Sequence, residues 1–331
     1  MQQQRSTLLM ITALFLGLLV FSFLTTDDLG SFGITILSGL FQGMLLFLVA
    51  SGLSIIFGLM DILNFAQGGF FMVGAYITFA VFHGETFAQL DPNLRFPLAI
   101  LIATAAGGIL GIILERGLLR PLYARPIFQL VLTFGVAIVI GEAIKAIWGT
   151  VAYSWSPLTS FGIHQASFSL FDQQFGLYRL FVIGVGLLLI VLIALLLQRT
   201  RIGIIIRAGV EDSEMVEALG INVRAVFTQV FMLGCAVATF GGAIAAPFLG
   251  ASLGMGNAFL LAAISVVVLG GLGSYAGTAV GSLLVGLAIA VVAKFASRPE
   301  INQTVWSSIT PMILLVLVLL ARPSGLFGKE R

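Results

Sequence analysis

Almost the whole chain is apolar, and its polar residues gather in a few short interruptions. An apolar run of about 20 residues is long enough for a helix to cross the roughly 30 Å hydrocarbon layer of a membrane. The pattern therefore predicts an all-α polytopic membrane protein with about ten transmembrane segments, some of them short or broken. The expected segments are 7–24, 34–57, 68–82, 97–114, 129–148, 180–197, 225–249, 258–269, 276–293 and 304–321.

The first apolar run has Arg5 before it and Asp27 and Asp28 after it. A secretory signal peptide is the alternative interpretation of such a run. No cleavage site with small residues follows it, so we expect a helix that is retained.

Two runs, 68–82 and 258–269, are short for a membrane span, and each adjoins a glycine cluster. The surrounding sequences are GLMDILNFAQGGFFMVGAY (58–76) and LGGLGSYAGTAVG (269–281). Interrupted hydrophobic segments at comparable places in two halves of a chain point to a translocation path. Irregular backbone at membrane depth persists only where it is buried in protein or lines a wet cavity.

These two interruptions supply the candidate residues of the path or its gate. In one alternative, Asp61, Asn64 and Gln67 only cap helices at the cytoplasmic surface and contact no solute. In the other, the path is lined or gated by residues of both interruptions, namely Asn64, Gln67, Gly68, Gly69, Gly271, Gly273 and Ser274.

The longest charged interruption is 199–224, in which arginines flank a short acidic stretch. Asp212 or Ser213 is a plausible helix N-cap, and Gly220 is placed to end the helix. Two turns of helix are unstable alone in water, so this helix needs support from the membrane and from another protein. The charged residues concerned are Arg199, Arg201, Arg207, Arg224, Glu211, Asp212, Glu214 and Glu217.

Composition supports the membrane assignment, since 59% of residues are hydrophobic, only 9% are charged, and the mean hydropathy is +1.13. Soluble domains carry about a quarter charged residues. The single cysteine, Cys235, lies in an apolar run, so neither a disulfide framework nor a metal cluster is expected. The net charge of +2 says little about partners.

The positions of the basic residues predict the orientation. Ten crossings with both termini in the cytoplasm satisfy the positive-inside rule. The outside then receives Arg95, Arg179 and Arg298, with Lys145 and Lys294 near outer helix ends. The cytoplasmic side receives Arg5, Arg116, Arg120, Arg125, Arg199, Arg201, Arg207, Arg224, Arg322, Lys329 and Arg331.

The long segment 149–178 then lies outside and is rich in aromatic residues. It is a natural place for an external protein to dock, but its aromatic rings could equally lie against lipid headgroups. The rings in question belong to Tyr153, Trp155, Phe161, Phe168 and Phe171.

Ionisable residues within or beside the spans are functional candidates by default. Glu142 and Lys145, three residues apart, are more simply explained as a mutually neutralising pair. Glu115 and Lys294 stand at helix ends and are expected to extend their charges toward water. The spacings GGILG (107–111) and GTAVG (277–281) predict close helix packing.

The function classes differ in what they require. The chain lacks a Gly-x-x-x-x-Gly-Lys-Ser/Thr phosphate loop, so it cannot hydrolyse ATP by that route and would need a partner. An enzyme would need a nucleophile, an acid–base group or a metal set, and none is evident. A secondary transporter or channel for a small solute is the alternative, and an ion-driven carrier would be expected to need carboxylates buried in mid-membrane.

Several blocks resemble the LivH-type permeases of branched-chain amino acid ABC importers, in family order and nearly end to end. The first is NFAQGGFFMVGAY (64–76), although Gln67 stands where many relatives have histidine. Gly209-Val210 also departs from the Cys-Ala that relatives often carry. The other blocks are LERGLLRPLYARP (114–126), TRIGIIIRAGVEDSEMVEALGINV (200–223), VVLGGLGSYAGTAVGSLLVG (267–286) and ARPSGLFG (321–328).

The resemblance implies one transmembrane permease domain over 1–331 in a bacterial or archaeal cytoplasmic membrane. It implies that 199–224 holds the coupling helix that enters a cleft of a partner ATPase. It also implies a second LivM-type permease, two LivG/LivF-type ATPases that use ATP and magnesium, and an external solute-binding protein. No cofactor bound by this chain and no nucleic acid are implied. Branched-chain amino acids are the default solute, while urea, amides and other amino acids stay open.

Overall fold

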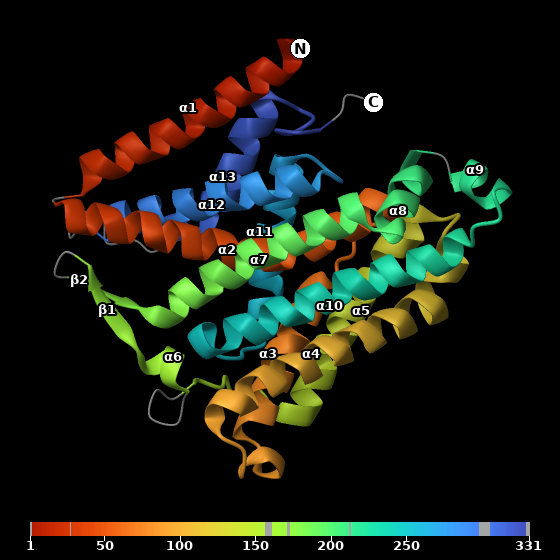
Figure 1. Ribbon diagram of the computed structural model, residues 1–331, viewed down its shortest axis with the longest axis horizontal. Coiled ribbons are helices and arrows are strands. Elements are labelled where there is room, and N and C mark those ends of the chain that lie inside the picture. The colour runs from red at the N-terminus through yellow and green to blue at the C-terminus, as the bar shows by residue number, and fades with distance from the viewer. Residues whose placement is uncertain are drawn as a thin grey trace.

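In the computed structural model of the protein, the described residues are 2–26, 28–155, 161–170, 173–211, 213–297 and 305–328. Only the backbone is described at 2–8, 170, 202, 207, 209–211, 213 and 214. Over these residues the protein is a bundle of long helices with one small hairpin at one end (Figure 1).

Each of the ten predicted runs corresponds to one helix. The helices are α1 (Gln2–Thr25), α2 (Leu29–Met60), α3 (Gln67–His83), α4 (Pro92–Leu114), α5 (Pro126–Trp148), α7 (Leu177–Arg199), α10 (Val223–Leu249), α11 (Met255–Gly270), α12 (Tyr275–Ala296) and α13 (Val305–Ala321). Among the described residues, six spans are long and apolar enough to cross a membrane: those that begin at Leu29, Pro92, Pro126, Leu177, Val223 and Tyr275. The prediction of an all-α polytopic membrane protein is confirmed.

Shorter elements lie between these helices. The connections contain η1 (Glu85–Phe87), the π-helix η2 (Glu115–Leu119), η3 (Arg120–Leu122), α6 (Gly162–Gln165), α8 (Arg201–Glu211) and α9 (Ser213–Ala218). Strands β1 (Ser167–Leu170) and β2 (Gln173–Gly176) pair antiparallel, a hairpin that the apolar pattern did not predict.

The centre of the bundle is α2, surrounded by α10 and α12. Within their apolar windows, 83% of α2 and 78% of α10 is buried, against 17% of α5 and of α7. The exposed faces of α5 and α7 are themselves apolar, for example at Val139 and Leu188. Contiguous apolar surface of this kind needs lipid or another membrane subunit to cover it.

Helices α2 and α12 lie side by side (Figure 1), and glycines allow their backbones to touch. A Cβ on Gly39 would lie 2.8 Å from the Leu287 Cα, and one on Gly286 would overlap the backbone nitrogen of Gly43. The small-residue spacings at 107–111 and 277–281 have the same effect. Gly107 and Gly111 pack on α10, and Gly277 and Gly281 pack on α11, so close packing at both predicted places is confirmed.

The two short helices begin inside the bundle. The Gln67 amide, at the start of α3, contacts Gly52, which is roughly 12 Å before the end of α2 at a rise of about 1.5 Å per residue. At the start of α11, a Cβ on Gly256 would lie 2.8 Å from the Gly68 oxygen. The two helix starts therefore meet inside the bundle, before the end of α2 is reached.

From this meeting point α3 and α11 run in opposite directions. Phe82, near the end of α3, packs on Trp155 of the segment between α5 and α7. Leu269 and Gly270, at the end of α11, bond to the segment that follows α13. Helices of 17 and 16 residues span about 24–26 Å, so neither alone reaches across a full membrane.

At one end of the bundle, the segment that joins α5 to α7 folds down onto the helices. Tyr153 and Ala251 exchange two backbone hydrogen bonds of 2.8 Å. Trp155 and Phe161 are 7% and 4% exposed, so these two rings do not lie against lipid headgroups. The His164 Nε2 lies 2.9 Å from the Pro247 oxygen, and burial lowers the pKa of this histidine. Phe168 packs edge-to-face on Phe175 in the hairpin, and Phe171 falls outside the described residues.

We predict that Gly286→Ala prevents α2 and α12 from reaching their native separation, because the new methyl group would overlap the Gly43 backbone. Overpacking of this kind costs about 1–3 kcal/mol or more. The melting temperature of the purified protein in detergent should fall clearly. Gly184→Ala on α7 is the matched control, since no atom lies within 4 Å of its added methyl group. Equal melting temperatures for the two variants would contradict the prediction.

Candidate translocation and coupling sites

The first interruption, between α2 and α3, is held inside the bundle by polar side chains. Asn64 and Gln67 are 1% and 0% exposed. The Asn64 Nδ2 donates to the Gln67 Oε1 at 3.2 Å, and the Gln67 Nε2 donates to the Gly234 oxygen on α10 at 3.0 Å. Neither side chain lies at the bundle surface.

The backbone of this interruption is satisfied by its neighbours. The Asn64 Oδ1 accepts from the backbone N–H of Ala66 at 3.1 Å, and the hydroxyl of Thr133 on α5 accepts from the N–H of Phe65 at 3.3 Å. Asp61 ends α2 with φ +52°, a left-handed conformation that is uncommon for a residue other than glycine. Gly68 and Gly69 follow at once, where α3 packs on Gly256 and on Ile140.

The second interruption, Gly271 to Ser274, joins α11 to α12. Gly271 and Gly273 have φ of +102° and +78°, so both positions favour glycine. The Ser274 Oγ accepts from the N–H of Gly277 at 3.0 Å and caps α12. A Cβ on Gly273 would lie 3.2 Å from the Gly58 Cα, which brings this turn beside the end of α2.

The segment after α13 covers the second interruption. The N–H groups of Leu326 and Phe327 donate to the oxygens of Leu269 and Gly270 at 2.8 and 2.9 Å. Leu326 is fully buried. A cavity of about 260 Å³ lies beside this contact, lined by Phe57, Asp61, Val268, Leu272, Pro323, Ser324 and Gly328. Sequence analysis singled out the block ARPSGLFG (321–328), but no spacing rule predicted that it contacts the turn from Gly271 to Ser274.

The charged segment forms two helices: α8 packs against α7, and α9 projects from the bundle (Figure 1). The predicted start and end of the acidic helix are confirmed, since α9 begins at Ser213 and Gly220 follows it at φ +81°. The N–H of Gly220 bonds to the Glu217 oxygen at 2.9 Å, and the N–H of Ile221 bonds to the Val216 oxygen at 3.3 Å. This pair of bonds is a Schellman motif.

Around α9 the described side chains face different surroundings. Val216 is buried, whereas Met215 and Leu219 are 63% and 74% exposed, and Glu217 is also exposed. Arg207 and Glu211 lie in α8 and Glu214 in α9, with only their backbone described. Asp212 lies outside the described residues. The preceding helix, α8, was not predicted.

A buried ionic cluster adjoins the start of α10, and here the prediction that Glu115 extends toward water is wrong. Glu115 is 0% exposed. Its carboxylate accepts from the Thr228 hydroxyl at 2.6 Å and from the Tyr123 hydroxyl, and the Arg120 Nε lies 3.4 Å away. Burial, together with the bond to Glu115, raises the pKa of Tyr123, which keeps this donor protonated.

The cluster escaped sequence analysis because Thr228 lies far along the chain from Glu115, Arg120 and Tyr123, and only packing brings it to them. Arg120 also donates to the Thr228 hydroxyl at 3.0 Å, so α10 is tied to the loop between α4 and α5. By contrast, the predicted pair of Glu142 and Lys145 is confirmed at 2.6 Å and is exposed.

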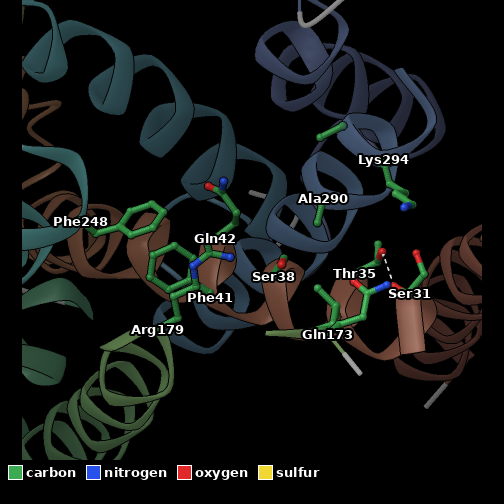
Figure 2. A pocket seen from close by; sticks show the side chains of 12 residues that line it. Ser31, Thr35, Ser38, Phe41, Gln42, Gln173, Arg179, Phe248, Ala290 and Lys294 are labelled. Atoms are coloured by element: carbon green, nitrogen blue, oxygen red, sulfur yellow. Dashed lines mark hydrogen bonds between the residues drawn. The ribbon is translucent and has the colours of Figure 1, made fainter. Parts of the chain in front are cut away.

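Two cavities open along one side of α2. The first, of about 290 Å³, is shown in Figure 2 and is lined by Ser31, Ile34, Thr35, Ser38, Phe41, Gln42, Gln173, Arg179, Phe248, Ala290, Ala293 and Lys294. The second, of about 440 Å³, is mostly apolar and also contacts Gln42. Lys294, expected only to extend toward water, lines the first cavity.

The helix bundle, with paired broken helices at its centre, defines a polytopic membrane protein of the transport class. Residues 35–319 match the family model described as "Branched-chain amino acid transport system / permease component". The chain belongs to this family.

Curated relatives identify the subtype. The chain is 30% identical to the high-affinity branched-chain amino acid transport permease BraD of Pseudomonas aeruginosa, over 89% of this chain and 95% of the relative. It is 26% identical to LivH of Escherichia coli K12, over 88% and 94%. LivM of the same organism is 29% identical but is covered over only 69% of its length. The chain is thus a LivH-type permease, as the resemblance predicted.

We predict that Glu115→Ala destabilises the protein by about 3 kcal/mol, because it leaves the Arg120 cation and the Tyr123 hydroxyl partly buried without their acceptor. The matched control is Glu142→Ala, which removes a carboxylate from an exposed pair and should cost at most about 1 kcal/mol. Thermal unfolding in detergent measures both. If the two variants unfolded at the same temperature, the buried cluster would have no special role in stability.

Proposed function

We propose that this chain is one of two membrane subunits of an ABC importer that carries branched-chain amino acids or a related small polar solute across the cytoplasmic membrane of a bacterium or archaeon. The observation that carries the proposal is the pair of short helices, α3 and α11, whose starts meet inside the bundle in a chain of this family. Discontinuous helices that start near the bilayer midplane are the usual frame of a solute path.

The proposed assembly contains a LivM-type permease, two LivG/LivF-type ATPases and an external solute-binding protein. The recurrence of LivM among the relatives supports a second permease subunit. The apolar outer faces of α5 and α7 offer surface for such a neighbour. ATP and magnesium belong to the partner ATPases in this proposal, and the chain itself is not catalytic.

The proposed contact with the ATPase is the segment 199–224. Met215 and Glu217 are exposed in the six-residue α9, and Leu219 is exposed directly after it, so this segment is a small amphipathic projection that is too short to be stable alone. The acidic residues Glu211, Asp212, Glu214 and Glu217, with Arg207, are proposed to engage the ATPase cleft.

The proposed orientation places both termini and this segment in the cytoplasm. In Figure 1 the start of α1 and the end of α13 lie toward the same end of the bundle as α8, and the hairpin lies at the opposite end. Most arginines belong to the end that holds α8, which agrees with the positive-inside rule.

A carrier driven by an ion gradient fits less well. Among the described residues, the buried charged side chain is that of Glu115, which lies at the end of α4 and is neutralised by Arg120. A proton or ion relay is expected to use ionisable groups facing the interior of the bundle at depth.

The test is uptake into proteoliposomes by the purified four-subunit complex with its binding protein, with labelled leucine as the solute. ATP-dependent accumulation is expected. Equal uptake by this chain alone, without ATP, would replace the proposal by a secondary transporter or a channel.

We predict that Gly220→Pro uncouples ATP hydrolysis from uptake and reduces uptake to background. Proline cannot adopt the φ of +81° at this position, and it removes the N–H that bonds to Glu217. Gly220→Asn is the matched control, because asparagine tolerates the left-handed conformation and keeps the N–H.

Glycine and serine in place of residues 211–217 should have the same effect as the proline. The measurement is the number of ATP molecules hydrolysed per solute moved, by complexes of equal purity and composition. Wild-type uptake in the proline variant would remove the proposed role of this segment.

We predict that Asn64→Ala and Gln67→Ala change the rate or apparent affinity of uptake while the complex still assembles. Both side chains hold the interruption against α10, close to the meeting point of α3 and α11. Gln129→Ala is the matched control, since Gln129 is also buried and donates to a carbonyl, that of Leu122, at 2.8 Å. Identical uptake defects in all three variants would indicate a general loss of buried amides rather than a gate.

A further inference from the structure

The first cavity of α2 has an unusual charge balance. Its lining contains two cations, Arg179 and Lys294, and no carboxylate among the described residues. Asp28, near the rim, already accepts from the N–H of Ser31 at 2.7 Å as the N-cap of α2. The other polar groups of the lining are the hydroxyls and amides of Ser31, Thr35, Ser38, Gln42 and Gln173.

Aromatic rings, not an acidic partner, position the guanidinium of Arg179. Its Cζ lies 5.7, 5.3 and 5.0 Å from the ring centres of Phe41, Phe175 and Phe248. Among the described residues Arg179 makes neither an ion pair nor a hydrogen bond. Rings hold the plane of a guanidinium by cation–π attraction and leave its N–H donors free.

The cavity follows one face of α2 from its start toward mid-depth. Ser31, Ile34, Thr35, Ser38, Phe41 and Gln42 recur at helical spacing, over roughly 16 Å of helix at about 1.5 Å per residue. Figure 2 shows Lys294 near Ser31 and Thr35, and Arg179 beside Phe41 farther along α2. Lys294 therefore lies beside the start of α2, and Arg179 lies farther along the same helix.

The second cavity continues this face. Gln42 lines both cavities, and Leu46, one turn deeper, lines the second. The remaining walls of the second cavity are largely apolar and come from α11, α12 and α13, for example at Phe259, Ile289 and Met312. Along α2, the first cavity, which is lined by two cations, is therefore followed by a second cavity that is mostly apolar.

We infer that these cavities form an entry site for a small amphipathic solute that bears a carboxylate, with Arg179 and Lys294 as its receptors. A volume near 300 Å³ is at the lower end of ligand sites, which suits a molecule of amino-acid size. Guanidinium binds carboxylate through two parallel N–H donors. The apolar part of the solute lies against Phe41 and Phe248 or enters the second cavity.

This inference rests on the proposed function and narrows the range of solutes that the importer would carry. Urea and uncharged amides lack the group that Arg179 would bind, so amino acids and other carboxylates become the favoured solutes. The cavity also lies at the end of the bundle that the proposed orientation places outside, where a binding protein would release its cargo.

A cysteine in the cavity wall provides the test. The native Cys235 is 0% exposed and should not react in the folded protein, so Ser38→Cys places one accessible thiol in the first cavity. The full complex in proteoliposomes is treated with a membrane-impermeant maleimide from the binding-protein side. The alkylation rate is measured with L-leucine, 4-methylpentanoate or leucinamide added, in the absence of the binding protein.

The expected result is that L-leucine and 4-methylpentanoate slow alkylation, while leucinamide, which lacks the carboxylate, does not. Arg179→Gln should raise the concentration needed for protection by about tenfold or more, the usual effect of losing a hydrogen bond to a charged group. Lys294→Gln should have a smaller effect in the same direction, and Arg179→Lys should restore part of the protection.

Two controls separate specific from general effects. Lys145→Gln removes an equal charge from an exposed pair that does not line the cavity and should leave protection unchanged. Ser167→Cys, exposed on the hairpin, should be alkylated but not protected.

Equal protection by leucinamide, or unchanged protection after Arg179→Gln, would overturn the carboxylate site. Protection by anionic lipid alone, in liposomes of varied composition, would also overturn it. Failure of the proposed function is distinguishable, because it appears as loss of ATP-dependent leucine uptake by the unmodified complex.

Discussion

Where a chain breaks its helices away from water, each freed backbone N–H and C=O must find a partner within the protein. This constraint shapes both interruptions of the bundle. Between α2 and α3, Asn64 and Thr133 accept the N–H groups of Ala66 and Phe65. Between α11 and α12, the segment after α13 donates to Leu269 and Gly270. Each interruption is therefore stabilised by a remote part of the chain, and the two lie close together at the end of α2.

The same end of the bundle links these interruptions to the charged segment. Helix α10 begins at Val223, directly after α9 and its glycine stop, and carries both Thr228 and Gly234. Thr228 belongs to the buried cluster of Glu115, and Gly234 accepts from Gln67. One rigid helix thus connects the projecting segment, the buried ionic cluster and the first interruption. This continuity supports the proposed transmission of force from an ATPase to the solute path.

The opposite end is organised by aromatic packing. Trp155 and Phe161 turn inward and pack on Phe82 of α3 and Phe96 of α4, so these two rings are not exposed to lipid. The hairpin contributes Gln173 to the rim and Phe175 to the side of Arg179. The first cavity remains beside this cap, with its cations held apart from any described acidic partner. The two ends of the bundle therefore differ chemically: one holds this aromatic segment and the first cavity, and the other holds the charged segment 199–224.

The sequence by itself determined the features that depend on neighbouring residues. Apolar runs of span length specified ten helices, the arginine bias separated the two ends, and Ser213 and Gly220 marked the bounds of α9. It also determined membership of the family, through blocks spread along the chain. Features that join distant residues needed the tertiary structure. The depth of Gln67, the burial of Glu115, the inward rings of the outer segment and the cationic cavity all arise where separate helices meet. Hydropathy and capping are local properties, whereas burial and ion pairing depend on which helices become neighbours, and only packing decides that.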